Sequence, residues 1–215
     1  MPDLAVSHRA LGHFFAFEGL DGSGKSTQAR LLSERLAASG GPKPLLLREP
    51  SSGPTGQAIR ERLSGNGPGL DPQSEMELFL ADRAWDAENN ILPALRLGRP
   101  VIIDRYVLSN VAYQGARGLI PIEAIFSANA AFPVPDLTFL LEIPPETAWG
   151  RIKARGPLVD NFESLDYLKK VKAVYDSLSW PGLTRIPAEL PPETVHGRVL
   201  SALSGLGRPG AFPLP

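Results

Sequence analysis

The chain has 215 residues, which is enough for one substantial α/β domain and gives no strong case for two. Its 22 lysines and arginines nearly balance its 23 aspartates and glutamates, and the net charge of −1 argues against a nucleic-acid-binding or anionic-membrane surface. The sequence has no cysteine, which excludes disulfides and thiolate metal sites and fits a reducing compartment. With no secretory signal and no apolar run of the ~20 residues that a membrane span needs, we expect a cytoplasmic protein.

The first predicted element is the strand Phe14–Glu18, and the pattern after it is the most informative in the chain. Residues 19–26 match the phosphate-loop pattern G-x-x-x-x-G-K-[ST], and Lys25–Ala38 has the apolar spacing of a helix. The glycines let backbone N–H groups converge on a phosphate, and the helix N-terminus adds partial positive charge. A glycine turn that carries Lys-Ser by chance is the alternative, and the flanking strand and helix argue against it.

We therefore expect the phosphate loop to bind ATP. Lys25 would reach the β- and γ-phosphates, and the Ser26 hydroxyl would ligate Mg²⁺. The expected ATP-binding residues are Gly19, Leu20, Asp21, Gly22, Ser23, Gly24, Lys25, Ser26 and Thr27.

Strands and helices alternate along the rest of the chain. The further predicted strands are Pro44–Arg48, Val101–Asp104, Leu137–Ile143 and Leu183–Ile186. The further predicted helices are Thr55–Leu63, Gln73–Leu97, Ser109–Gln114, Ile122–Ala130, Pro145–Ala154, Phe162–Leu178 and Pro192–Leu203. This alternation predicts an α/β fold of three layers, the P-loop NTPase type, with a mostly parallel five-stranded sheet and helices on both faces.

We expect residues 1–215 to form a single domain. Pro93 should bend or end the longest helix, because proline disrupts a helix interior. Glycine and proline make residues 65–72 and 156–160 candidates for mobile segments and residues 205–215 a loose tail.

Charged residues gather where three of the predicted strands end. These clusters are Glu18-Gly19, Arg48-Glu49-Pro50 and Asp104-Arg105-Tyr106. Ligands of open α/β sheets bind at the carboxyl ends of the strands. Residues 101–104 also have the form of a Walker B strand, whose Asp104 would organise Mg²⁺ together with Ser26.

Several motifs, in this order, resemble the thymidylate kinase family. They are residues 17–27, Arg48-Glu49-Pro50, residues 78–83 (LFLADR), residues 104–115 (DRYVLSNVAYQG), residues 135–142 (PDLTFLLE), and the helix that ends in Arg155-Gly156. The resemblance covers about Phe14 to Tyr175. It implies transfer of the γ-phosphoryl of ATP to dTMP, giving dTDP and ADP, with Mg²⁺ as cofactor. It also implies a homodimer and no nucleic-acid or membrane partner.

The resemblance further assigns an acceptor site. Arg48 and Arg105 would hold the phosphate of dTMP, Phe79 would stack on thymine, and Tyr113 would lie against the deoxyribose. The full set that it implies for dTMP is Asp21, Arg48, Phe79, Arg83, Arg105, Asn110, Tyr113 and Gln114. Spacing i, i+4 puts Phe79 and Arg83 on one helix face.

Some of these residues have plainer interpretations. Phe79 could be a core residue, and Arg83 a solvated partner of Asp82 or Glu88. Tyr113 and Gln114 could be ordinary helix residues.

The segment near 151–163 resembles a mobile lid over ATP. Family members place a catalytic arginine in the phosphate loop or in the lid, and Gly22 occupies the loop position here. Arg155, with Arg151 one turn before it, would then supply that charge, as in the bacterial subgroup. The implied catalytic residues are Lys25, Asp104, Arg105, Arg151 and Arg155.

Two positions depart from the family pattern. Asn161 stands where arginine is common, and Ser51-Ser52 follows Arg48-Glu49-Pro50 where Gly-Gly is usual.

Two other functions stay open at the level of sequence. A related P-loop kinase could phosphorylate a deoxynucleoside or another nucleoside monophosphate, and Glu49 or Asp104 could be the base for a hydroxyl acceptor. A non-catalytic ATP-binding regulator would use the phosphate loop alone, and it would give Phe79, Arg83 and Arg105 no purpose.

Overall fold

A computed structural model of the chain describes residues 12–64, 70–155 and 164–205. Its sheet has five parallel strands in the order β2-β3-β1-β4-β5. The strands are β1 (Phe14–Gly19), β2 (Leu45–Arg48), β3 (Val101–Asp104), β4 (Leu137–Glu142) and β5 (Leu183–Pro187). Every residue of β1 and β3 is buried, whereas the edge strand β2 alternates between half-buried and exposed. Continuous apolar strands are typical of a parallel sheet covered on both faces, and the predicted α/β fold is confirmed.

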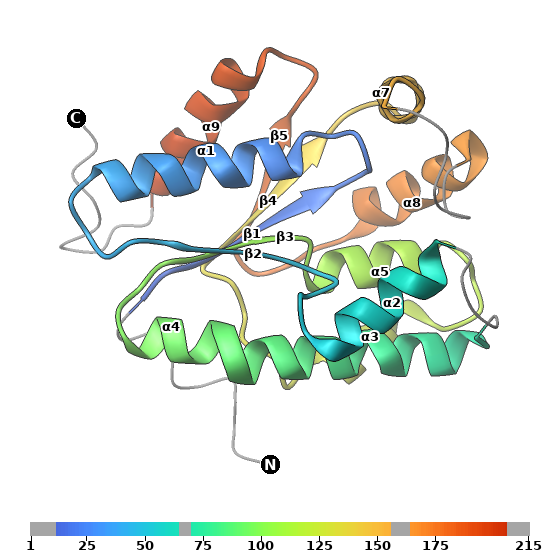
Figure 1. Cartoon of the computed structure of the whole chain (residues 1–215). Helices are drawn as coiled ribbons and strands as arrows, with labels where there is room; N and C mark the ends of the chain where they lie inside the picture. The colour runs from blue at the N-terminus through green and yellow to red at the C-terminus, as the bar shows by residue number, and fades with distance from the viewer. Residues whose placement is uncertain (1–11, 65–69, 156–163, 206–215) are drawn as a thin grey trace.

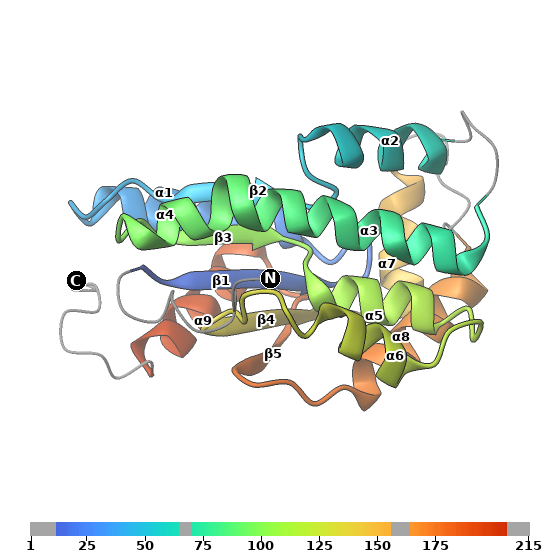
Figure 2. The same ribbon diagram turned by 90° about the horizontal axis from the view of Figure 1, so that it is seen from below.

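Helices cover both faces of the sheet (Figure 1). The helices α1 (Lys25–Ala38) and α9 (Pro192–Ser204) lie on one face and contact each other. The helices on the opposite face are α3 (Pro72–Asp86), α4 (Leu92–Arg96), α5 (Val107–Gly115), α6 (Ile122–Asn129, seen beside α5 in Figure 2) and α8 (Leu165–Ser177). The helices α2 (Pro54–Leu63) and α7 (Pro145–Lys153) lie beyond the carboxyl ends of the strands. No helix in the described ranges is both long and apolar enough to cross a bilayer.

The longest predicted helix is interrupted rather than ended at Pro93. The regular α-helix α3 ends at Asp86, a π-helical turn η1 spans Ala87–Ile91, and α4 continues from Leu92. The N–H of Leu92 donates to the carbonyl of Ala87, five residues earlier. Proline has no N–H and its ring crowds the preceding turn, and a π-helical turn is a common adjustment at such a point. The three segments follow one another as a single rod (Figure 2).

The register of the sheet brings three strand ends together. Asp104 of β3 is aligned with Phe17 of β1 on one side and with Arg48 of β2 on the other. The charged clusters after these strands therefore lie at one edge, as the sequence indicates. The remaining predicted segments 65–69, 156–163 and 206–215, which include most of the proposed lid and tail, lie outside the described residues.

Candidate active site

The phosphate loop joins β1 to α1. Gly19, Gly22 and Gly24 have φ angles of 134°, 82° and 99°, a region that side chains disfavour. Lys25 opens α1, and its Nζ donates to the carbonyl oxygens of Gly19 at 3.1 Å and Leu20 at 2.8 Å. The ammonium group is thus held over the loop, where the phosphates of a nucleotide would bind.

Lys25 is buried and is surrounded by charged side chains of both signs. Burial lowers its pKa to about 8, and the nearby Arg105 contributes to this shift, whereas Asp21 and Asp104 oppose it. The polyanionic phosphates of ATP would favour the protonated form.

Ser26 and Asp104 meet between α1 and β3. The Ser26 hydroxyl donates to Asp104 Oδ2 in a short hydrogen bond. The other carboxylate oxygen, Oδ1, is buried and has no hydrogen-bond partner within the described ranges. Mg²⁺ prefers oxygen ligands and keeps several waters when it binds with substrate phosphates. The Ser26 hydroxyl and Asp104 Oδ1, the carboxylate oxygen without a partner among the described residues, are ligands that fit such an ion.

Arg105 lies in a turn between β3 and α5 and is the only non-glycine described residue with a positive φ, 72°. Its guanidinium pairs with Asp21 of the phosphate loop and donates to Ser109 Oγ at 3.1 Å. It also lies 4.9 Å from the ring centre of Tyr113, whose hydroxyl donates to Asp21 at 2.8 Å. Strained backbone at a charged contact of this kind is common in functional sites.

The charge of Asp21 is stabilised by these contacts. Burial alone would raise the pKa of its carboxyl, but Arg105, Lys25 and the Tyr113 hydroxyl together hold that pKa well below its ordinary value. Asp21 is therefore ionised, and it holds Arg105 beside the phosphate loop.

Glu18 supports the turn that carries Arg105. Its buried carboxylate accepts hydrogen bonds from the Tyr106 N–H at 2.9 Å, from Ser109 Oγ and from Tyr175 Oη at 3.4 Å. Burial raises the pKa of Glu18, and the hydrogen bond from Ser109 opposes the rise. Sequence reasoning noted Glu18 as a polar strand end and missed this support and Tyr175.

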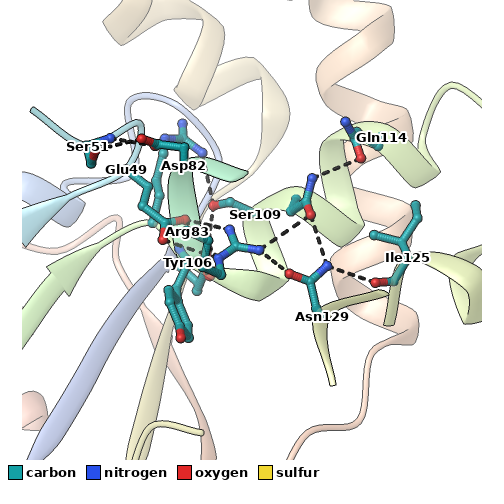
Figure 3. A network of polar contacts seen from close by, with 12 residues as sticks. Glu49, Ser51, Asp82, Arg83, Tyr106, Ser109, Gln114, Ile125 and Asn129 are labelled. Carbon is teal, nitrogen blue, oxygen red and sulfur yellow. Dashed lines mark hydrogen bonds and ion pairs between the residues drawn. The ribbon is translucent and has the colours of Figure 1, made fainter. Parts of the chain in front are cut away.

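Arg83 of α3 is almost completely buried, and Figure 3 shows it within a network of polar contacts. It donates to both carboxylate oxygens of Glu49 and to the side-chain oxygen of Asn129 on α6. The alternative that Arg83 is a solvated partner of Asp82 or Glu88 is wrong. Burial raises the pKa of Glu49 to about 7 even though Arg83 acts in the opposite direction. No local sequence pattern predicts that Arg83 contacts Glu49 or Asn129.

Ser51 attaches the segment after Arg48 to α3. Its N–H and hydroxyl donate to the two oxygens of Asp82, at 2.7 and 2.6 Å. Helix α2 approaches the same serine closely, since a Cβ built on Gly56 would lie 2.0 Å from the Ser51 carbonyl oxygen. Serine at this position, where the family pattern has glycine, thus makes a specific contact.

A cavity of about 750 Å³ adjoins the phosphate loop. All eight residues that the resemblance assigns to dTMP line it: Asp21, Arg48, Phe79, Arg83, Arg105, Asn110, Tyr113 and Gln114. Arg155, exposed after α7, lines it as well. Residues from separate stretches of sequence therefore surround one cavity.

The two lid arginines occupy different places. Arg155 lines the cavity, whereas Arg151 of α7 donates from Nη1 to the carbonyl oxygen of Gly22 at 3.1 Å. The loop and α7 are tightly packed, since a Cβ on Gly22 would lie 2.8 Å from the Ala148 carbonyl oxygen. Asn161, the position that departs from the family pattern, lies outside the described residues.

Comparisons with known proteins agree with the motifs. A family model described as thymidylate kinase matches residues 17–199. The thymidylate kinase of Xanthomonas campestris pv. campestris (strain B100) is 42% identical over 204 residues, which cover 93% of this chain and 88% of that protein. The thymidylate kinase of Xanthomonas oryzae pv. oryzae (strain PXO99A) is 39% identical over 214 residues, 96% of this chain and 92% of that protein.

A relative from a third organism has a similar name. A protein of Archaeoglobus fulgidus named "Probable thymidylate kinase" is 46% identical over 164 residues, which cover 74% of this chain and 79% of that protein. The family model spans most of the chain, and the relatives match along most of their own length. The chain belongs to the thymidylate kinase family.

Proposed function

We propose that the chain is an ATP-dependent dTMP kinase whose acceptor binds in the cavity beside the phosphate loop. Family membership supports the reaction, which is transfer of the γ-phosphoryl group of ATP to dTMP. The observation that carries the residue roles is the shared cavity, which all eight expected acceptor residues and Arg155 line.

Catalysis of this reaction depends mainly on positive charge around the reacting phosphates. A phosphate monoester has a second pKa of ~6 and is mostly dianionic at neutral pH, so the acceptor needs no general base. The obstacle is repulsion between two polyanions, and fixed cations aimed at the transferred group reduce it. Lys25 would act on the β- and γ-phosphates, Arg48 and Arg105 on the acceptor phosphate, and Arg155 on the group in transfer. Arg151, bonded to Gly22, would hold the loop against α7 and add charge beside it.

Mg²⁺ with ATP is part of this proposal. Ser26 and Asp104 would hold the ion, which supplies charge neutralisation at the phosphates when bound. Asp104 Oδ1, which has no hydrogen-bond partner among the described residues, supports this assignment.

The base side of the cavity would bind the nucleotide in one orientation. Phe79 would stack on thymine, and Arg83, held by Glu49, would hydrogen-bond to its edge. Tyr113 would lie against the deoxyribose and disfavour a 2′-hydroxyl, while its contact with Asp21 links the sugar side to the phosphate loop.

The rival of a deoxynucleoside kinase needs a base for a hydroxyl acceptor. Glu49 is the first candidate, but Arg83 occupies both of its carboxylate oxygens. We also propose one domain, a homodimer as the family resemblance implies, and the cytoplasm as the compartment that supplies ATP and dTMP. Light scattering of the purified chain tests the dimer.

A substrate panel tests the function. Thymidine, dTMP, dUMP and dCMP are compared as acceptors in steady-state assays of ADP release with Mg²⁺ and ATP. We expect dTMP to have the highest kcat/KM and thymidine to give no acceptor-dependent release. A preference for thymidine would establish the rival, and ATP binding without any acceptor-dependent release would indicate a regulator.

Arg83→Ala tests the placement of the acceptor. Lost hydrogen bonds from a charged group cost ~1.5–3 kcal/mol, so dTMP binding should weaken about tenfold or more while ATP binding is kept. Calorimetric titrations of each nucleotide measure both. Equal weakening of the two, or of ATP alone, contradicts the assignment.

A further inference from the structure

Three side-chain amides form a chain of hydrogen bonds between Arg83 and the cavity. They are Asn129 at the end of α6, then Asn110 and Gln114 on α5, and we call them the amide relay. Figure 3 shows the contacts that run from Arg83 through Asn129 toward Gln114. An amide has a donor end and an acceptor end, so such a chain has a direction.

The direction is fixed at Asn129. Its oxygen faces Arg83 Nη1, and a guanidinium has donors only, so that atom must be an acceptor. Its nitrogen lies 2.8 Å from the Ile125 carbonyl oxygen, which accepts only, so that atom must be a donor. The two neighbours impose the same orientation on Asn129.

The orientation of Asn129 determines the orientations of the Asn110 and Gln114 amides on α5. Asn129 Nδ2 donates to Asn110 Oδ1 at 3.0 Å, which leaves Asn110 Nδ2 to donate to Gln114 Oε1 at 2.9 Å. Arg83 Nη1, 3.5 Å from Asn110 Oδ1, agrees with the same assignment. The carbonyl oxygen of Gln114 is thereby occupied.

The relay ends on a donor. Gln114 is 6% exposed, lines the cavity, and its Nε2 is buried without a hydrogen-bond partner in the part of the chain that the structure describes. A buried donor without a partner costs free energy, and a ligand acceptor would remove that cost. The atom that the relay leaves without a partner in this cavity-lining residue is therefore a donor.

We propose that Asn129 is a positioning residue that sets the direction of the amide relay and thereby selects the pyrimidine. The inference rests on the proposed function, because it takes the cavity as the site of the acceptor base. A donor at Gln114 matches a carbonyl oxygen on the base edge and opposes an exocyclic amino group. Thymine carries a carbonyl oxygen at the position where cytosine carries the amino group. Asn129 touches neither substrate and acts through Asn110 and Gln114.

Asn129→Asp reverses the relay without removing the acceptor for Arg83. The introduced carboxylate cannot donate, so it loses the hydrogen bond to the Ile125 carbonyl oxygen, and the Asn110 amide turns its nitrogen toward that carboxylate and its oxygen toward Gln114. Gln114 then donates to Asn110 and presents Oε1 to the cavity. We expect the dTMP to dCMP ratio of kcat/KM to fall at least about tenfold, the cost of one mismatched buried hydrogen bond. The change should appear in the KM of the monophosphates, with the KM of ATP within about twofold of wild type.

Two matched variants separate direction from mere damage. Asn129→Ala removes the contacts without reversing them, so it should weaken both monophosphates and shift their ratio far less. Asn89→Asp makes the same chemical change at an exposed residue and should keep the wild-type ratio. A ratio that Asn129→Asp leaves within about twofold, or that Asn129→Ala shifts equally, overturns the proposal.

Gln114→Glu covers the case in which Asn129→Asp does not fold. It places an acceptor at the cavity whatever the state of Asn129, so the same fall in the ratio is expected, and an unchanged ratio overturns the donor assignment. Calorimetric Kd values for dTMP and dCMP are measured beside the kinetics. A wild type that binds dTMP tightly but transfers nothing to it contradicts the proposed function, while its binding preference still tests the relay.

Discussion

Ser51 joins the segment that carries Arg48 to helix α3 through one carboxylate, that of Asp82. Ser51→Ala removes the hydroxyl and keeps the backbone contact. Because hydrogen bonds to charged groups contribute ~1.5–3 kcal/mol, we expect the free energy of unfolding to fall by that amount. The KM for dTMP should rise several-fold because Arg48 is less firmly placed. Urea unfolding and steady-state kinetics measure the two effects.

The neighbouring Ser52 provides the control. It is exposed, and its hydroxyl has no hydrogen bond within the described residues. Ser52→Ala should stay within about 0.5 kcal/mol of wild type, as surface substitutions do. If both variants behave alike, Ser51 does not position the acceptor loop.

Alanine substitutions of Arg155 and Arg151 should affect the kinetics differently, because Arg155 lines the cavity and Arg151 contacts the phosphate loop. Arg155→Ala should lower kcat about 10²-fold or more with little change in either KM, since a contact made as the phosphoryl group moves acts on the transition state. Arg151→Ala should also raise the KM of ATP, because it removes the hydrogen bond to Gly22. Full kcat in both variants would exclude a lid arginine from catalysis.

Burial of Lys25 between the phosphate loop and α1 lowers the pKa of its ammonium group. Its pKa of about 8 should rise when the phosphates of ATP bind, so the protein should take up protons. At about pH 8.5 a group with that pKa is mostly neutral, and we expect an uptake of about half a proton or more. Calorimetric titration of Mg²⁺ and ATP in buffers of different ionisation enthalpy measures this number.

Lys25→Arg is the matched control, because a guanidinium is protonated throughout this range. Its binding should release or take up no proton from this position. Equal uptake in both proteins would assign the proton to another group, and no uptake in the wild type would contradict the shift of Lys25.

The elements themselves could be predicted because each carries its own local pattern. Predicted and observed bounds of α1, α2 and β3 differ by at most one residue, since spacing, glycine and proline mark them. The π-helical turn at Ala87–Ile91 could not be predicted, because no local pattern distinguishes a proline that ends a helix from one that a π-helical turn accommodates. Contiguous motifs likewise located the phosphate loop and the strand ends.

The contacts that support the site were beyond sequence reasoning. Arg83 pairs with Glu49 and Asn129, which are 34 and 46 residues away, and Glu18 contacts Tyr175 at a separation of 157 residues. Each contact depends on how helices from different parts of the chain pack. A charged or amide residue has many potential partners in a sequence, and only the fold selects one.

At the scale of the whole molecule, buried carboxyls tie stability to pH. Burial raises the pKa of Asp86 to about 6 from an ordinary value of 3.8, and its Oδ2 has no hydrogen-bond partner in the described ranges. Between these two values the folded state holds a proton that the unfolded state has lost, so folding stability falls as pH rises. The loss is complete above about pH 6.

Asp86→Asn removes this dependence. Relative to wild type, the variant should gain about 1–3 kcal/mol of unfolding free energy as pH rises from about 4 to about 7. The charge of Asp86 also contributes to the raised pKa of Glu49, so Asp86→Asn lowers the Glu49 pKa, and this adds to the gain in the same direction. Urea unfolding at a series of pH values measures the curve, and parallel curves would show that Asp86 is not the responsible group.

The close packing of Gly22 against α7 bears on how such enzymes diverge. Gly22 has a φ of 82°, and any side chain there would meet the backbone of Ala148. An arginine introduced at this position alone would strain the loop and displace α7, the helix that carries Arg151 and precedes Arg155. A catalytic arginine can therefore move from the lid to the loop position only if α7 also lies farther from the phosphate loop.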